Sequence, residues 1–490
     1  MKKQIFFLFI LLYTAACAVH AQETPQTQWT GPSVNFKAGK IGVSANGRYL
    51  VHKNGTPFFY LGDTAWELFH RMTEAEVEQY LENRRSKGFT VIQAVILAEL
   101  DGLNTPNALG DLPLTDQHAV QPNEKYFKWV DKVIRMAEKK GLYIGLLPTW
   151  GDKVDKQWGT GPEIFNPMTA GLYGTWLGRR YKGFKNIIWI IGGDRWGGDG
   201  NYATWDALGK SIKKEDKNHL MTFHPQGWNS SSKWFHNCLW LDFNMAQTGH
   251  CDRSYSGFQE FIVSDYNRQP VKPCLDGEPR YENHPVCWKP EEKGWFDDAD
   301  VRQALYWDLF SGSCGHTYGC HDIWQVLDKG RNPVGHARGN WKTSMDLPGA
   351  FDLVHARRLM EAYDWSSRVP DPSMIASENE DLEHKIVALR GDGFAFVYFP
   401  NGEEATLDVS NVAKGQELTC IWMNPRTGER MSSASTAEKK TGDGVLSSPG
   451  KLQGEIRHSV KGTVHIVPPS SGRGNDWVLI LEKKESVREK

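Results

Sequence analysis

Two carboxylates stand beside glycines at the ends of two apolar segments. The run at 187–191 leads into Gly192-Gly193-Asp194, and the run at 271–275 leads into Asp276-Gly277-Glu278-Pro279. Glycine lets a ligand approach the backbone closely. Two carboxyl groups facing one bond can hydrolyse a glycosidic linkage, because one protonates the leaving oxygen and the other attacks the anomeric carbon or activates water. We therefore predict Asp194 and Glu278 as a catalytic pair.

The acid of such a pair must keep its proton near neutral pH, which requires apolar or negatively charged surroundings. Trp189 and Trp196 could supply the apolar part around Asp194. The alternative is structural, because a carboxylate after a strand often caps the next helix or pairs with a nearby arginine. For one carboxylate alone this alternative is favoured, whereas for both together the catalytic interpretation is favoured.

Other polar and aromatic residues at strand ends are candidates for binding a substrate. They are Asp63, Trp66, Trp150, Arg195, His224, Gln247, Arg280 and Tyr318. Each has a structural alternative: helix capping for the aspartate, rim packing for the tryptophan at 150, and salt bridges, which we favour, for the arginines. No metal site is predicted, because His316, His321 and Asp322 match no common ligand spacing.

The elements that must position these residues alternate between apolar segments and amphipathic helices. Strands are expected at 58–61, 91–97, 143–147, 186–191, 220–223, 241–245, 271–275 and 314–318. Helices are expected at 73–86, 124–139, 168–181, 205–214, 255–263, 300–310 and 353–362. Continuous apolar strands indicate burial on both faces. Eight such units predict an α/β fold of the (β/α)8 barrel type, whose active face is built by the loops after the strands.

The chain divides into four segments by composition and pattern. We expect a signal peptide at 1–21, an arm at 22–45, the catalytic barrel at 46–368 and a β-sandwich at 369–490. In the last segment, short strands are expected at 386–389, 394–399, 405–409, 418–423, 464–467 and 477–482. We interpret this domain as a packing partner for the barrel.

The first residues indicate export. Lys2 and Lys3 precede the apolar run 5–12, and Val19-His20-Ala21 fits a small-x-small cleavage site. Lipidation of Cys17 is the less favoured alternative. We expect the mature protein in the periplasm or at the cell surface of a Gram-negative bacterium, with no membrane-spanning segment.

Seven of the eight cysteines follow the expected cleavage site, so at least one thiol is unpaired or bonded externally. Local disulfides are conceivable for Cys314 with Cys320 or for Cys238 with Cys251, but sequence does not assign connectivity. We favour buried thiols plus one disulfide that joins loops.

Composition narrows the class of partner. The formal net charge is −2, which gives no electrostatic case for binding nucleic acid. The 20 tryptophans indicate either a densely packed core or a cleft that stacks flat ligands such as sugar rings. Oligomeric state is not indicated.

The chain resembles the bacterial apiosidase-like proteins of glycoside hydrolase family 140. The resemblance rests on Tyr60-Leu61-Gly62-Asp63-Thr64-Ala65-Trp66, the two carboxylate motifs and the trailing β-domain, and it covers about residues 35–485. It implies that Asp194 is the acid/base and Glu278 the nucleophile of a retaining enzyme without metal or organic cofactor. The implied substrate is the pectic polysaccharide rhamnogalacturonan-II, cut internally between apiose and galacturonic acid.

The resemblance implies that Arg195 and Arg280 could bind galacturonate carboxylates. One departure from the broader clan of barrel glycosidases is that Gly193-Asp194 replaces its usual Asn-Glu pair, which moves the proton donor back by one methylene. Two other functions stay open: a glycan-binding surface protein without catalysis, and a glycosidase that acts on another polysaccharide such as β-mannan or β-glucan.

Overall fold

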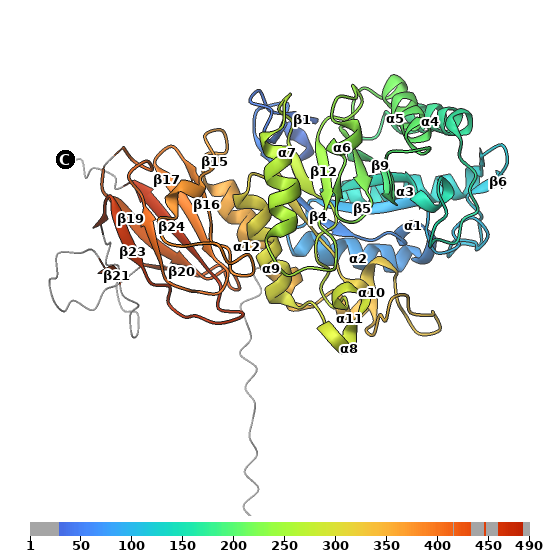
Figure 1. Cartoon of the computed structure of the whole chain (residues 1–490). Helices are drawn as coiled ribbons and strands as arrows, with labels where there is room; N and C mark the ends of the chain where they lie inside the picture. Colours follow the sequence, from blue (N-terminus) through green and yellow to red (C-terminus); the bar gives the residue numbers. More distant parts are fainter. Residues whose placement is uncertain (1–28, 415, 433–444, 447–458, 484–490) are drawn as a thin grey trace, which may run out of the picture.

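The structure is a computed structural model that describes residues 29–414, 416–432, 445–446 and 459–483. The expected signal peptide and Cys17 lie outside the described residues. Figure 1 shows an α/β domain on the right and an antiparallel β-domain on the left. Within the described part of the chain, no helix is long and apolar enough to cross a membrane.

Eight parallel strands form the α/β domain, and each overlaps one of the eight expected segments. They are β4 (Tyr60–Thr64), β5 (Val91–Leu97), β8 (Tyr143–Thr149), β9 (Ile187–Arg195), β10 (Met221–Pro225), β12 (Asn244–Gln247), β13 (Cys274–Asp276) and β14 (Gly315–Tyr318). Hydrogen bonds join them as two arcs, ordered β10-β9-β8-β5-β4-β14 and β12-β13. The predicted (β/α)8 barrel is confirmed, with β10 lying against β12 and β13 against β14 where the arcs meet.

Helices surround the strands. The larger ones are α2 (Glu74–Ser86), α3 (Glu124–Lys139), α4 (Pro167–Tyr181), α5 (Tyr202–Glu215), α9 (Asp298–Phe310) and α12 (Pro348–Ala362). Short helices are α1 (Leu68–Arg71), α6 (Ser232–Phe235), α7 (Ser264–Asn267), α8 (Pro290–Lys293), α10 (His321–Trp324) and α11 (Trp341–Ser344). The expected helix at 255–263 is instead a π-helical turn, Phe258–Val263, that continues into α7. At α2, Thr73 and Glu76 form the expected capping box.

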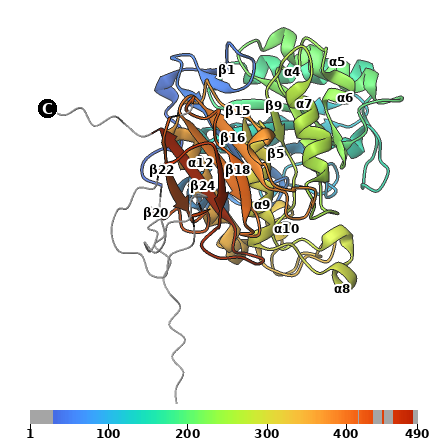
Figure 2. The same cartoon turned by 60° about the vertical axis from the view of Figure 1, so that its left-hand side comes forward.

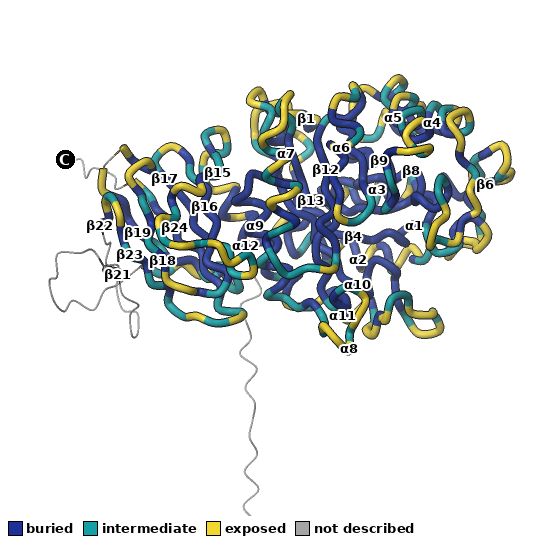
Figure 3. The backbone as a smooth tube through the Cα atoms, viewed as in Figure 1, coloured by how far each residue is buried: buried dark blue, intermediate teal, exposed yellow. Residues whose placement is uncertain are grey.

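Alternate residues of the strands face two different cores. In β9, Ile188 and Ile190 belong to the core inside the barrel, whereas Ile187 and Trp189 belong to the core under the helices. Every residue of β5 and β8 is buried, as the dark strands of Figure 3 show. This two-sided burial is the reason that the strands are rich in apolar residues, with Gln93 a buried polar exception in β5.

A three-stranded antiparallel sheet closes the amino-terminal end of the barrel. It consists of β1 (Ile41–Val43) in the expected arm, and of β2 (Leu50–His52) and β3 (Pro57–Phe58) at the start of the expected barrel segment. Leu50 and Phe58 pack in one core with Tyr60 and Tyr143 at the starts of β4 and β8. The opposite end of the barrel, at the carboxyl ends of its strands, is where a functional site can lie.

The C-terminal domain is a sandwich of two sheets, as predicted, and nearly all of its strand pairs are antiparallel. One contains β15 (Val369–Pro370), β16 (Val387–Gly391), β17 (Phe394–Phe399), β24 (Trp477–Lys483), β19 (Leu418–Met423), β20 (Arg430–Ser432) and β22 (Ser459–Val460). The other contains β18 (Ala405–Asp408), β23 (Thr463–Ile466) and β21 (Val445–Leu446), the last paired parallel to β23. Residues of both sheets share one hydrophobic core.

The sandwich packs on α9 of the barrel, and the turned view in Figure 2 brings it in front of α9 and α12. Tyr306 stacks on Tyr398 with ring centroids 4.8 Å apart. The buried Arg302 of α9 pairs with Asp476 at 2.9 Å and with Asp352 at 2.7 Å. These buried contacts fix the β-domain against the barrel, away from the carboxyl ends of the strands.

Candidate active site

A cleft of about 630 Å³ lies at the carboxyl ends of the barrel strands. Six tryptophans line it, namely Trp66, Trp150, Trp158, Trp228, Trp288 and Trp324. Trp158, Trp228 and Trp288 are roughly half exposed, at 57%, 46% and 45%. A cleft with many flat apolar faces and a few polar groups suits a ligand with sugar rings.

Asp194 enters the cleft because the backbone at the end of β9 bends sharply. Gly192 and Gly193 have φ values of 93° and 130°, and Asp194 itself has φ 52°. A Cβ atom at Gly192 would lie 2.4 Å from the carbonyl oxygen of His224, and one at Gly193 would lie 2.9 Å from Trp150. Only glycine fits both positions, so the Gly-Gly pair is what aims the aspartate.

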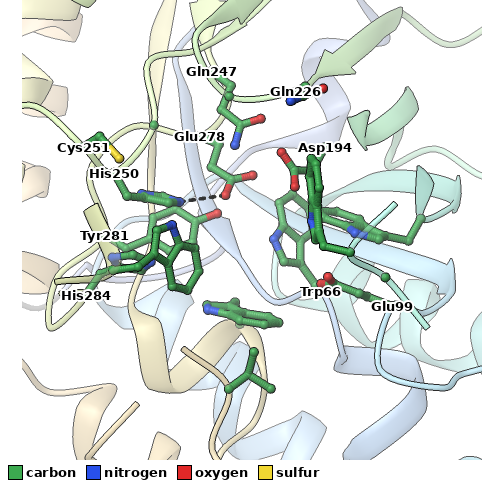
Figure 4. A pocket seen from close by; sticks show the side chains of 18 of the residues that line it. Trp66, Glu99, Asp194, Gln226, Gln247, His250, Cys251, Glu278, Tyr281 and His284 are labelled. Carbon is green, nitrogen blue, oxygen red and sulfur yellow. Dashed lines mark hydrogen bonds and ion pairs between the residues drawn. The ribbon is translucent and has the colours of Figure 1, made fainter. Parts of the chain in front are cut away.

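Glu278 reaches the same cleft from the loop after β13. Its side chain is 8% exposed, compared with 20% for that of Asp194. His250 Nε2 lies 2.9 Å from Oε1 of Glu278, and His224 Nε2 lies 3.0 Å from Oε2. Figure 4 shows the carboxyl groups of Asp194 and Glu278 on opposite sides of the cleft, both pointing into it.

His224 connects the two carboxylate positions. The backbone N–H of Asp194 donates to His224 Nδ1 at 3.3 Å, which leaves Nε2 as the protonated nitrogen that faces Glu278. The imidazole packs edge-on against Trp66 with ring centroids 5.4 Å apart and lies 6.0 Å from Trp150. These two tryptophans therefore hold the ring in the orientation that serves Glu278.

The surroundings push the two pKa values apart. Burial, followed by the charge of Glu278, raises the pKa of Asp194. Burial would also raise the pKa of Glu278, but the contacts from His224 and His250 outweigh it and hold that pKa below its usual range. One carboxyl group is thus suited to carry a proton and the other to be ionised, which is the division that acid and nucleophile require.

Several buried polar atoms of the cleft wall have no protein partner among the described residues. They include Trp150 Nε1, Gln247 Oε1, His250 Nδ1, the Tyr281 hydroxyl and His284 Nε2. Buried polar groups are nearly always hydrogen-bonded, so a set left open around one cavity indicates where a polar ligand binds. Tyr281 also lines the cleft, and burial together with the charge of Glu278 raises the pKa of its hydroxyl.

Five of the sequence-predicted residues line this cleft: Asp194, Glu278, Trp66, Trp150 and Gln247. The imidazole of His224 lies behind the wall and touches Glu278 rather than the open space. A role in holding a sugar stays a prediction for Trp66, Trp150, Gln247 and His224.

Asp63 and Tyr318 lie elsewhere. The Asp63 carboxylate is fully buried and accepts from Arg84 Nε at 2.6 Å and from the Tyr80 hydroxyl at 2.5 Å. The Tyr318 hydroxyl donates to Glu282 at 2.6 Å. Their predicted contact with substrate is therefore corrected to a structural role inside the barrel wall.

Arg195 and Arg280 are also corrected. Arg195 donates to the carbonyl oxygens of Asp155, Asp194 and Lys156 at 2.7–3.0 Å, and its side chain is fully buried. Arg280 donates to the carbonyls of Asp252 and Ser254 and to Gln303. Both guanidinium groups hold loops, so neither is available to a galacturonate carboxylate.

The sequence interpretation missed part of the lining, namely Glu99, Trp158, Trp228, His250, Tyr281, His284 and Trp288. A signal existed for two of them. His250 follows Gln247 by three residues, and Tyr281 follows Glu278 by three. Including three more residues of the loop after each strand would have identified both.

A disulfide between Cys251 and Cys287 joins the loops that follow β12 and β13. The two pairs suggested from the sequence are wrong, since Cys238, Cys314 and Cys320 are free. The favoured arrangement, buried thiols with one loop disulfide, agrees with the structure. The bonded cysteines adjoin His250 and Trp288, so the disulfide ties two parts of the cleft wall together.

The chain matches the family model "Apiosidase-like, catalytic domain" over residues 44–367 and the model "Putative collagen-binding domain of a collagenase" over residues 369–482. A solved structure described as a glycoside hydrolase is 34% identical, with TM-score 0.81, and the match covers 92% of this chain and 99% of that one. A glycoside hydrolase family 5 structure from Bacteroides vulgatus is 31% identical, with TM-score 0.82, covering 93% and 96%. No curated protein matched. With the carboxylate pair at its strand ends, the chain belongs to the apiosidase-like family of glycoside hydrolases.

Proposed function

We propose that this protein is a retaining endo-apiosidase that cuts the bond between apiose and galacturonic acid in rhamnogalacturonan-II. The observation that carries the catalytic part is the pair of opposed carboxyl groups with pKa values shifted in opposite directions. The linkage is suggested by the match to the apiosidase-like domain.

The reaction follows from the two environments. Glu278 attacks the anomeric carbon while Asp194 gives its proton to the leaving oxygen, which forms a glycosyl ester on Glu278. Asp194, now ionised, takes a proton from water, and the water opens the ester with a second inversion at the same carbon. His224 and His250 support the ionised nucleophile before the first step.

The open shape of the cleft supports internal cleavage. Trp158, Trp228 and Trp288 are exposed along its mouth and offer stacking faces for more than one sugar unit.

The test is to incubate the protein with purified rhamnogalacturonan-II and follow the anomeric protons of the first product by NMR. A product that keeps the anomeric configuration of the substrate, with apiose at the new reducing end, supports the proposal. Inverted configuration refutes the double displacement. Pectic fragments that bind but stay intact indicate the glycan-binding alternative, and cleavage of β-mannan or β-glucan instead indicates a different substrate.

We also propose that the protein is exported. The Cys251–Cys287 disulfide supports an oxidising compartment such as the periplasm or cell surface. Fractionation of cells, followed by sequencing of the mature amino terminus, tests the location and the cleavage site.

A further inference from the structure

The peptide unit that joins Gly277 to Glu278 is held at both of its polar groups by buried side chains. Its carbonyl oxygen, on Gly277, accepts from Gln93 Nε2 at 3.0 Å. Its N–H, on Glu278, donates to Asp276 Oδ1 at 3.2 Å. Gln93 comes from the middle of β5 and Asp276 from the end of β13, and both side chains are fully buried. The backbone of Glu278 is therefore tied to two strands of the barrel.

The peptide unit needs this support because it follows a glycine. Glycine has the least restricted backbone, so the unit after Gly277 is the part of this strand exit that rotates most easily. A rotation there would move the Glu278 carboxyl group relative to His224 and His250, which contact its two oxygens. Rotation would also leave buried polar groups unpaired, which costs free energy, so the two side-chain contacts oppose it.

Asp276 also holds the neighbouring strand exit. Its Oδ2 accepts from the Thr248 hydroxyl at 2.5 Å, and its Oδ1 accepts from the Thr248 N–H at 3.4 Å. Thr248 directly follows β12 and stands two residues before His250. One buried carboxyl group thus fixes the exit that carries Glu278 against the exit that carries an imidazole partner of Glu278.

Gln93 is hard to explain by stability alone. It is the single polar residue of β5, and its Oε1 has no partner among the described residues. An apolar side chain of similar size would fill this place without the cost of burying an amide that is only partly hydrogen-bonded. The contact with the Gly277 carbonyl oxygen is what the amide provides that an apolar residue does not.

We infer that Gln93 and Asp276 are positioning residues, which hold the Gly277–Glu278 peptide unit in place and so orient the Glu278 carboxylate toward the substrate. Neither residue lines the cleft, so both act through Glu278. The inference rests on the proposed function for the role of Glu278 as nucleophile, and it adds two residues that this role requires.

The first test removes the donor of Gln93. Gln93→Met has a side chain of similar length without an N–H group, so Glu278 should lose its fixed orientation. We expect kcat on rhamnogalacturonan-II to fall about 10- to 100-fold and KM to stay within about threefold. The acidic limb of kcat/KM should move to higher pH, because the carboxyl group is held less well against His224 and His250. A wild-type kcat, or a lower kcat with the acidic limb in place, overturns the role of Gln93.

Asn186 offers a matched control at the amino-terminal end of the barrel. It is fully buried just before β9, and its Nδ2 donates to the carbonyl oxygens of Ile134 and Leu142 at 2.9 and 3.0 Å. Its Oδ1, like Oε1 of Gln93, has no partner among the described residues. Asn186→Leu should lower the melting temperature but leave kcat within about twofold when assayed on folded protein. Equal losses of kcat in both variants would mean a general effect of removing a buried amide, and would overturn the inference.

The second test uses two substitutions of Asp276. Burial, followed by the charge of Asp308, raises the pKa of Asp276 to about 7, so a neutral side chain is tolerated there. Asp276→Asn keeps an oxygen that accepts from the Glu278 N–H, whereas Asp276→Leu has none. We expect the leucine variant to lose at least tenfold more kcat than the asparagine variant. Equal losses contradict the role of Asp276. If a variant of one test does not fold, the other test decides.

A third measurement needs no substrate, so it separates this inference from the proposed function. In protein labelled with ¹³C at the carboxyl carbons of its glutamates, the signal that Glu278→Gln lacks reports the pKa of Glu278. This pKa should be higher in Gln93→Met than in the wild type and unchanged in Asn186→Leu. If rhamnogalacturonan-II is not cleaved, the proposed substrate is wrong, and this titration decides the inference. An unchanged pKa in Gln93→Met overturns it.

Discussion

The two strand exits that carry Asp194 and Glu278 hold the same functional group in opposite surroundings. At the end of β13, two imidazoles contact both oxygens of Glu278. At the end of β9, the carboxyl group of Asp194 faces the charge of Glu278, and its neighbour Arg195 lies 3.6 Å away with its donors committed to carbonyls. The difference teaches that the residue type supplies the acid, whereas its neighbours set its pKa and, in the proposed mechanism, decide whether it donates a proton or attacks.

The largest effect should come from removing either carboxylate. Glu278→Gln should lower kcat by about 10,000-fold, since no nucleophile remains. Asp194→Asn should lower it by about 100- to 10,000-fold, since the leaving oxygen is no longer protonated. Matched controls are Glu291→Gln in α8 and Asp199→Asn in the loop after β9, both exposed and outside the cleft lining. Wild-type turnover in either cleft variant, with the folded state intact by circular dichroism, would remove that residue from the mechanism.

The second largest effect should come from removing the imidazole of His250. His250→Ala removes a hydrogen bond to an ionised group, which is worth about 1.5–3 kcal/mol, so kcat/KM should fall about 10- to 100-fold. His250→Gln can keep a donor near Oε1 of Glu278 and should recover part of the loss.

The pH dependence of kcat/KM should show whether His250 acts through the pKa of Glu278. His224 and His250 hold the pKa of Glu278 low. In the proposed mechanism only the ionised form of Glu278 attacks the substrate. Losing one imidazole raises that pKa, so the acidic limb of kcat/KM should move to higher pH in His250→Ala. A fall in activity with the acidic limb in place would mean that His250 acts on the sugar and not on Glu278.

A smaller effect is expected at the mouth of the cleft. Trp158 is exposed and covers the Arg195 guanidinium, with its ring centroid 4.2 Å from Cζ. Trp158→Ala should raise KM about three- to tenfold through lost stacking and leave kcat within about twofold, whereas Trp158→Phe keeps a flat face and should be intermediate. Equal effects on KM and kcat would place this tryptophan in the chemical step instead.

The smallest effect on activity should come from Asp63, which the strand-end rule wrongly placed at the substrate. Asp63→Asn leaves the buried Arg84 without its counter-ion, so the free energy of unfolding should fall by about 3–5 kcal/mol. KM measured well below the melting temperature should stay within about twofold. Denaturant unfolding and initial rates check the two parts, and a raised KM with unchanged stability would restore the substrate role.

The sequence predicted most of the scaffold and the convergence of Asp194 and Glu278 on one cleft. Several strands were recognisable because strands buried on both faces carry long apolar runs, such as Ile187–Ile191. Asp194 and Glu278 were recognisable because strand ends of a barrel converge. The contacts that a side chain makes could not be predicted from the sequence. Nothing in the neighbouring residues indicates that Arg195 donates to the carbonyls of residues 155 and 156, or that Cys251 bonds to Cys287. Those contacts depend on loops that are remote in sequence.

The most direct test of the division of roles is to trap the intermediate. Asp194→Ala should still react with an aryl apioside, because an aryl leaving group needs no acid. The variant should then stall at the glycosyl ester, because no base activates water. After rapid denaturation, peptide mass mapping is predicted to find one sugar esterified to Glu278. A sugar on another residue, or no covalent sugar together with an inverted product, would contradict the account.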